Sequence, residues 1–147
     1  MTPGSRLRVT ITAGAIRRGP TLVKVNEAEA AAVTGGGLAG LRDLGARSVV
    51  VTSGATGARF LGADGRQLTV SHTPIPDALP VGSGDAFLAG FAAQWLLEPT
   101  PAAPETALRV AAAAARANAR HLPAGDITGD AVEAELTSVR ISASVAG

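Results

Sequence analysis

The chain has 147 residues, of which 46% are hydrophobic, 17% are charged and none is cysteine. This composition excludes disorder caused by high charge. It also excludes disulfide scaffolds, cysteine-based metal sites and thiol nucleophiles. A net charge of +1 gives no electrostatic argument for binding nucleic acid or an anionic membrane. No apolar run approaches the roughly 20 residues of a membrane span, and the first residues make a poor signal peptide. We therefore expect a cytoplasmic protein.

The first half of the chain predicts buried strands that alternate with short helices. The strands are apolar and mostly β-branched, and Asn26 is a good N-cap for the helix that follows the first buried strand. The residues around Gly65 carry a strong hairpin signal. In chain order, we expect a strand at 7–11, a strand at 22–25, a helix after Asn26 that ends near 34–37, a helix at 38–44, a strand at 48–52 and hairpin arms at 59–61 and 67–70.

The second half predicts an extended connection and then three helices before a last strand. The expected elements are a connection at 73–80, a helix from Gly82, a loop at 99–104, helices at 105–122 and 130–136 and a strand at 139–141. Strands that alternate with helices indicate an α/β fold with a mostly parallel sheet, flanked by helices and carrying one hairpin. The apolar helix faces expected to be buried contain Phe87, Leu88, Phe91 and Trp95 in one helix and Leu108, Ala111, Ala115, Ala119 and Leu122 in the next, with Arg109, Arg116 and Arg120 away from them.

The segment Gly82-Ser83-Gly84-Asp85 carries the clearest chemistry. A glycine-rich turn that leads into a helix leaves backbone N–H groups free to bind a phosphate or a developing anion. The helix dipole favours the ionised form of a carboxylate in the first turn. Asp85 could then take a proton from a substrate hydroxyl during phosphoryl transfer from ATP. The alternative is an ordinary glycine-rich loop with an acidic first turn.

Two further segments follow the expected strands, where ligands of open parallel sheets bind. Asn26 and Glu29 could hold a hydrated Mg²⁺ through their oxygens, and the alternative is a capping residue with favourable charges. The hydroxyls and glycines of residues 52–57 could line a nucleotide, and the alternative is a turn before the hairpin. His72 and His121 share no spacing with an acidic cluster, so we do not expect a histidine metal site.

Taken in order, these segments resemble the carboxyl-terminal half of the ribokinase-like (PfkB) carbohydrate kinase family. Residues 22–29 (LVKVNEAE) resemble its strand and Asn-x-x-Glu motif. Residues 45–58 (GARSVVVTSGATGA) resemble its nucleotide-side strand and turn, and residues 80–91 (PVGSGDAFLAGF) resemble its second signature. The sequence of residues 80–85, together with Lys24, is most similar to the branch that contains 1-phosphofructokinase and tagatose-6-phosphate kinase.

The resemblance implies a role for each matched residue. It makes Asp85 the catalytic base and implies ATP and Mg²⁺ as cofactors and a sugar or sugar phosphate as substrate. The other implied positions are Gly82, Ser83 and Gly84 as the anion hole, Asn26 and Glu29 as the residues that organise Mg²⁺ through water, Thr52, Ser53, Gly54 and Gly57 as the ATP-side turn and Asn118 as an adenine contact.

The resemblance also divides the chain. Residues 1–20 stay unassigned, and residues 21–147 match the carboxyl-terminal, ATP-binding part of a partial ribokinase-like fold. The amino-terminal half of the family, which supplies the sugar-binding acid and the lid, is not visible. The expected function is therefore ATP-dependent phosphorylation of a sugar or sugar-phosphate hydroxyl by a truncated chain. The alternatives are a nucleotide-binding remnant or pseudo-enzyme and a truncated product without a stable role. As partners, the chain could have a second copy of itself or the missing amino-terminal half.

Overall fold

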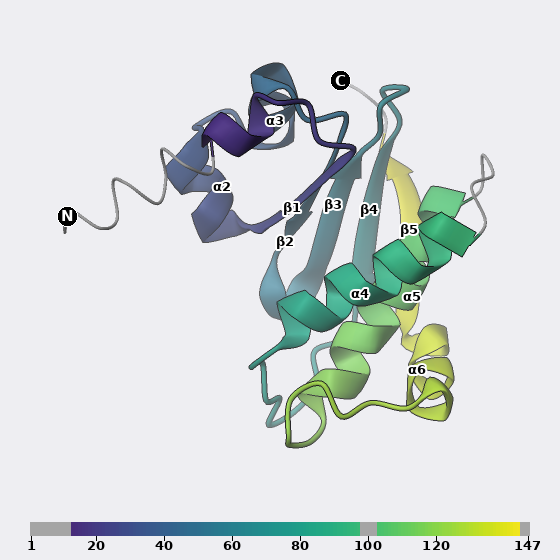
Figure 1. The fold of residues 1–147 in the computed structure, drawn as a ribbon. Helices are drawn as coiled ribbons and strands as arrows, with labels where there is room; N and C mark the ends of the chain where they lie inside the picture. The colour runs from purple at the N-terminus through teal and green to yellow at the C-terminus, as the bar shows by residue number, and fades with distance from the viewer. Residues whose placement is uncertain (1–12, 98–102, 145–147) are drawn as a thin grey trace, which may run out of the picture. The chain divides into compact units, whose positions relative to one another are not determined.

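The computed structural model describes residues 13–97 and 103–144 of the chain. The strand expected at 7–11 lies outside these residues. Residues 13–16 are helical, and the labelled elements follow them (Figure 1). In chain order these are β1 (Leu22–Asn26), α2 (Glu27–Val33), α3 (Gly37–Leu44), β2 (Ser48–Thr52), a 3₁₀ turn (Gly54–Thr56), β3 (Gly57–Leu61), β4 (Gln67–His72), α4 (Ser83–Leu97), α5 (Ala103–Ala119), α6 (Gly129–Glu135), a 3₁₀ turn (Leu136–Ser138) and β5 (Val139–Ser144).

The strands form a five-stranded sheet in the order β1-β2-β3-β4-β5. Strands β1 and β2 pair in parallel, in a register that runs from Leu22 opposite Ser48 to Asn26 opposite Thr52. A tight turn joins β3 to β4, because the N–H of Gly62 donates to the carbonyl of Arg66 at 2.8 Å. The predicted α/β class, with helices flanking the sheet and one hairpin, is confirmed.

The described residues form two compact units, and the first contains residues 13–53, 59–67 and 144. Helices α2 and α3 pack against β1 and β2, because apolar residues on each element converge on one cluster. Leu41 of α3 and Val49 of β2 are completely buried in it. The buried members of the cluster are Ile16, Val25, Ala30, Leu38, Leu41, Ala46, Val49, Val51 and Leu61.

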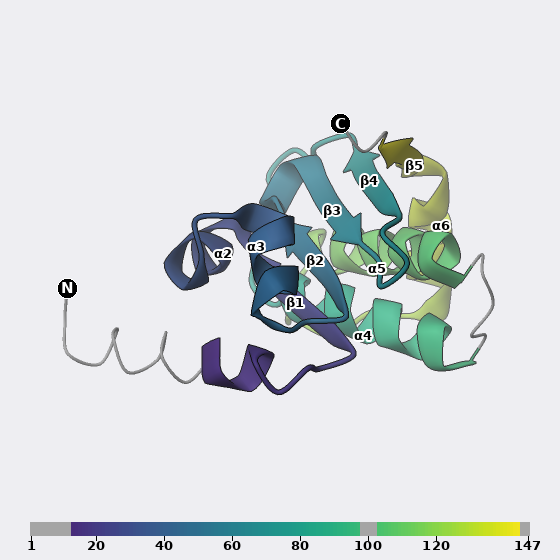
Figure 2. The same cartoon turned by 90° about the horizontal axis from the view of Figure 1, so that it is seen from above.

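The second unit contains residues 54–58, 68–97 and 103–143. Helices α4 and α5 lie side by side in both views, and α6 packs against α5 (Figures 1 and 2). The two long helices approach closely at Gly90, where an added Cβ would lie 3.1 Å from the Cα of Ala111 and 3.2 Å from the Cβ of Ala114. The alanine-rich sequence of α5 thus permits a close helix pair that larger side chains would separate.

Three expectations about the helix faces are wrong. Helix α5 ends at Ala119, and Leu122 is 64% exposed, because a residue before proline is biased away from helical geometry. Leu88 is 41% exposed, since α4 is apolar around most of its circumference and its sequence does not define a single face. Arg116, expected outside the core, is buried. Among the described residues, no helix is long and apolar enough to cross a membrane.

Candidate functional site

The turn before α4 requires a glycine at position 82. Gly82 has a φ of +79°, a conformation that side chains with a Cβ rarely adopt. A Cβ there would also lie 3.0 Å from the Cβ of Ala124. The N–H of Ser83 donates to the carbonyl of Pro80 at 3.0 Å, and that of Ala86 donates to the carbonyl of Gly82 at 2.9 Å. The sequence therefore folds here into the tight turn and helix start that its glycines predicted.

Buried Asn118 fixes this turn from α5. Its Nδ2 donates to the carbonyl of Val81 at 2.8 Å and to Oγ of Ser83 at 3.2 Å. Its Oδ1 accepts a hydrogen bond from the N–H of Gly125 at 2.6 Å. Only 1% of Asn118 is exposed, and its side-chain amide makes these hydrogen bonds within the protein. An adenine contact through this amide stays a prediction, whereas the structure gives the residue a role in holding two loops.

Asp85 stands exposed in the first turn of α4. The first N–H groups of a helix have no acceptor within the helix, and the amides of Gly84 and Asp85 are among them. Helix α4 has 15 residues, so its aligned peptide dipoles place partial positive charge at this end. A carboxylate and backbone amides that have no acceptor within the helix therefore share one helix terminus, as expected from the sequence.

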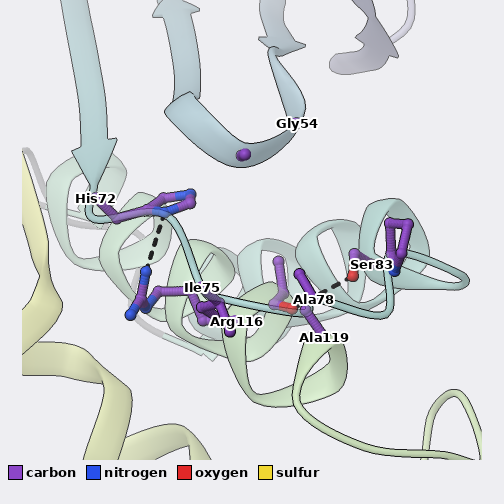
Figure 3. A pocket seen from close by; sticks show the side chains of 10 residues that line it. Gly54, His72, Ile75, Ala78, Ser83, Arg116 and Ala119 are labelled. Carbon is purple, nitrogen blue, oxygen red and sulfur yellow. Dashed lines mark hydrogen bonds between the residues drawn. The ribbon is translucent and has the colours of Figure 1, made fainter.

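A cavity of about 270 Å³ brings two predicted segments together (Figure 3). Gly54, from the turn after β2, and Ser83, from the start of α4, both line it. Most of the remaining wall is apolar and comes from the connection after β4 and from α5. The lining residues are Gly54, Ala55, His72, Ile75, Ala78, Pro80, Ser83, Ala115, Arg116 and Ala119.

The polar end of the cavity contains two residues that the sequence did not single out as site residues. The NH1 atom of Arg116 lies 3.1 Å from Nδ1 of His72, and it also donates to the carbonyl of Thr73 (Figure 3). The Nε atom of Arg116 donates to Oε2 of Glu135 at 2.8 Å. Arg116 and Glu135 are 5% and 6% exposed. The four residues come from β4, α5, α6 and the connection after β4, so no local pattern could have grouped them.

The electrostatics of this cluster favour a neutral His72 beside a charged ion pair. Burial lowers the pKa of His72, and the positive charge of Arg116 lowers it further. The carbonyl of Thr73 acts in the opposite direction, but the pKa stays below its ordinary value. Burial opposes ionisation of Glu135, but hydrogen bonds from Arg120 and Arg116 hold the pKa of Glu135 below its usual value. Two guanidinium groups thus stabilise one buried carboxylate, and the imidazole beside them stays uncharged at neutral pH.

The predicted magnesium residues form a capping box at the start of α2. Glu29 donates from its N–H to Oδ1 of Asn26 at 2.7 Å, and the N–H of Asn26 donates to Oε2 of Glu29 at 3.0 Å. Both side chains are exposed. The described part of the chain contains no group of three or more His, Cys, Asp or Glu side chains that could hold a metal. The capping alternative is therefore present in the structure, and a metal role stays a prediction.

The two hydroxyl side chains of the predicted ATP-side turn, Thr52 and Ser53, have different hydrogen-bond partners. The hydroxyl of Thr52 lies 3.4 Å from the carbonyl of Val25, and that of Ser53 donates to Glu27 at 2.9 Å. The same Glu27 oxygen pairs with Arg59 at 3.0 Å. The hydrogen bond from Ser53, and then the contact with Arg59, lower the pKa of Glu27 despite opposing desolvation.

Gly57 packs closely against the backbone of β4. It is buried, and an added Cβ would lie 1.9 Å from the carbonyl oxygen of Val70. Gly54 has a φ of +59° with open space around its Cα. Close contact thus requires glycine at position 57, whereas a positive φ favours glycine at position 54. Of the two, only Gly54 lines the cavity.

The chain matches the family model described as pfkB family carbohydrate kinase over residues 8–128. No curated protein matches it. Solved structures do match, and one is a Staphylococcus aureus protein provisionally described as a phosphofructokinase. It has a TM-score of 0.77 and 26% identity, over 91% of this chain and 45% of that one.

Two further matches are sugar kinases with bound ligands. A Vibrio cholerae fructokinase double mutant, in its fructose-, ADP- and potassium-bound form, has a TM-score of 0.70 and 26% identity over 78% of this chain and 40% of its own. Arabidopsis thaliana ribokinase, complexed with ribose and ATP, has a TM-score of 0.69 and 25% identity over 79% and 40%. The chain spans less than half the length of each of these relatives.

Proposed function

Because the chain belongs to the PfkB family of carbohydrate kinases, we propose that it carries the carboxyl-terminal, nucleotide-binding part of an ATP-dependent sugar kinase. The acceptor is the hydroxyl of a sugar or sugar phosphate, with 1-phosphofructokinase-like specificity. The observation that carries this proposal is the cavity that Gly54 and Ser83 line together. Gly54 follows a strand and was expected in the ATP-side turn, and Ser83 begins a helix and was expected in the anion hole for the transferring phosphoryl group.

The cavity suits the base of the nucleotide better than its phosphates. Its wall is mostly apolar, with Ile75, Ala78 and Pro80 from the connection after β4 and Ala115 and Ala119 from α5. Its volume of about 270 Å³ is just below the roughly 300–1,000 Å³ usual for whole small-molecule sites, so it would take part of a ligand. The ATP complex of the Arabidopsis relative supports the same class of ligand.

The start of α4 supplies the chemistry next to the cavity. Ser83 lines the cavity and also begins this helix, so a base in the cavity would place its phosphates toward the N–H groups of Gly84 and Asp85. In the proposed reaction a sugar oxygen bonds to the γ-phosphorus, the bond to the ADP oxygen breaks and Asp85 takes the hydroxyl proton. The helix terminus would stabilise the charge that develops on the transferring group.

Asn26 and Glu29 fit a water-mediated Mg²⁺ site by the chemistry of their donors. Each offers oxygen, and Mg²⁺ usually keeps several waters and takes few protein ligands. The capping box uses Oδ1 of Asn26 and Oε2 of Glu29, which fixes the orientation of the Glu29 carboxylate. When bound, the ion would neutralise phosphate charge. Glu29 would hold its water shell.

Titration calorimetry of the folded chain with ATP and Mg²⁺ tests the nucleotide part of the proposal. We expect saturable binding, and its absence from a sample with the circular dichroism of an α/β protein would reject the nucleotide role. A coupled assay that detects ADP with fructose 1-phosphate then separates a kinase from a nucleotide-binding remnant. ATP binding without turnover, both alone and with a supplied amino-terminal half of a family member, would favour the remnant.

A further inference from the structure

His72 places one ring nitrogen in the cavity and the other against Arg116. The ring extends from the end of β4 into the space between Gly54 and Ile75 (Figure 3). Nδ1 faces Arg116 at 3.1 Å. Among the described residues, Nε2 has no hydrogen-bond partner. The polar atom that His72 offers to a ligand is therefore Nε2.

Arg116 decides which nitrogen of His72 carries the proton. A guanidinium group has donors and no acceptor, so Nδ1 must accept from NH1. The carbonyl of Thr73 also lies near Nδ1, at the longer distance of 3.4 Å, and it accepts from the same NH1 atom. With Nδ1 accepting, the proton of the neutral ring lies on Nε2. The cavity then receives an N–H donor.

Glu135 holds the guanidinium group of Arg116 in one orientation. It accepts from Nε of Arg116 at 2.8 Å and also from Arg120, and Arg116 and Glu135 are both buried. The ion pair fixes the guanidinium plane, and the two hydrogens on NH1 are used by His72 and Thr73. Burial and the charge of Arg116 lower the pKa of His72, which keeps the ring neutral. Arg116 and Glu135 are therefore positioning residues for His72.

We propose that His72 determines base specificity: its Nε2–H donates a hydrogen bond to an acceptor nitrogen on the edge of the bound purine. This inference rests on the proposed nucleotide function. A phosphate is a poor alternative at this end of the cavity, because Glu135 neutralises Arg116 and the surrounding wall is apolar. A purine edge has acceptor nitrogens and an aromatic face, which match one donor in an apolar pocket.

Binding of ATP and its 1-deaza, 3-deaza and 7-deaza analogues, measured by calorimetry, tests the contact. We expect one analogue to bind the unmodified chain about 3- to 10-fold more weakly than ATP, which is the loss of one hydrogen bond. His72→Phe should weaken ATP binding by a similar factor and no longer discriminate against that analogue. His72→Gln, which keeps an N–H donor, should retain the discrimination, and His121→Gln is the matched control without effect.

Several results would overturn the inference. The His72→Phe variant could bind ATP as tightly as the unmodified chain. It could also weaken the binding of ATP and of all three analogues equally, which would mean that His72 contributes only to the shape of the cavity. Discrimination against 2′-deoxy-ATP in place of a deaza analogue would assign the partner to the ribose. If the folded chain binds no nucleotide at all, the proposed function fails as well, whereas binding without discrimination overturns only the role of His72.

The ¹⁵N spectrum of the His72 ring gives a readout that needs neither turnover nor ligand. The His121→Gln variant leaves His72 as the single histidine and simplifies the assignment. We expect the neutral ring to be protonated on Nε2, with Nδ1 in the chemical-shift range of an accepting nitrogen. A proton on Nδ1 would contradict the hydrogen bond from Arg116 and, with it, the proposed donor.

Discussion

Asn118 accepts a hydrogen bond from the N–H of Gly125 at 2.6 Å, and this contact fixes the loop after α5 to the helix itself. The other end of the same amide donates to the turn before α4. One buried side chain thus holds both loops that surround the start of α4. The geometry proposed to bind phosphate depends on a residue with 1% of its surface exposed.

Replacement of Asn118 by alanine should destabilise the protein by about 3 kcal/mol, because it removes the hydrogen bonds of a buried side chain to Val81, Ser83 and Gly125. Urea unfolding followed by circular dichroism measures this loss. Thr106→Ala, at an exposed position of the same helix, is the control and should change the unfolding free energy little. Equal effects of the two substitutions would show that the Asn118 contacts contribute no net stability.

The glycines at positions 54 and 57 should respond differently to alanine. Gly57→Ala should prevent folding or cost more than about 4 kcal/mol, because its Cβ would lie 1.9 Å from the Val70 carbonyl oxygen. Gly54→Ala meets nothing within 4 Å and should cost about 1 kcal/mol through its φ of +59° alone. Thermal unfolding of both variants gives the comparison, and a well-folded Gly57→Ala variant would contradict the close packing of β3 and β4.

Asp85→Asn should separate catalysis from nucleotide binding. We expect turnover to fall by about 10²–10⁴-fold in a kinase assembled with its sugar half, since the amide cannot accept the hydroxyl proton. Affinity for ATP should stay nearly unchanged. Asp43→Asn, at an exposed position of α3, is the control for a lost surface charge. A parallel loss of turnover and ATP affinity would reject Asp85 as the base.

Glu29→Gln tests the metal proposal without breaking the helix cap. The amide oxygen of glutamine can still accept from the N–H of Asn26, so stability should change by less than about 0.5 kcal/mol. The loss of charge should raise the Mg²⁺ concentration needed for half-maximal ATP binding. Calorimetric titrations at several Mg²⁺ concentrations measure it, with Glu133→Gln as an exposed control. An unchanged Mg²⁺ requirement would leave Glu29 with only its capping role.

The stability of the protein should fall in two separate pH windows. The pKa of His72 is lowered by burial, so below its ordinary value of 6.5 the unfolded chain binds more protons and stability falls until the folded pKa is reached. Although burial opposes it, the pKa of Glu135 is held below 4.5 by its arginine partners, so its contribution is present above that value and is lost in acid. Urea unfolding from about pH 8 to pH 2 measures both windows. His72→Gln should remove the upper window alone, and an unchanged upper window would show that another group titrates there.

The sequence predicted the helix start at Gly82 and the β1 and β2 strands well, because glycines, caps and β-branched runs are local signals. It failed for Arg116 because helical periodicity assigns a charged residue to solvent, whereas the compensating Glu135 lies 19 residues away. The adenine contact expected of Asn118 stays a prediction, but the structural role of this residue was not foreseen. The buried hydrogen bonds of that residue join segments up to 37 residues apart, which no local pattern contains.

The ion pair between Arg116 and Glu135 sets a practical limit on how this chain can be shortened. The family match ends at residue 128, and Glu135 lies beyond that boundary. A recombinant fragment cut at the boundary would keep a buried guanidinium and discard its counter-ion, a loss that typically costs about 3–5 kcal/mol. A fragment that ends at residue 128 should therefore be less stable than one that continues through Glu135.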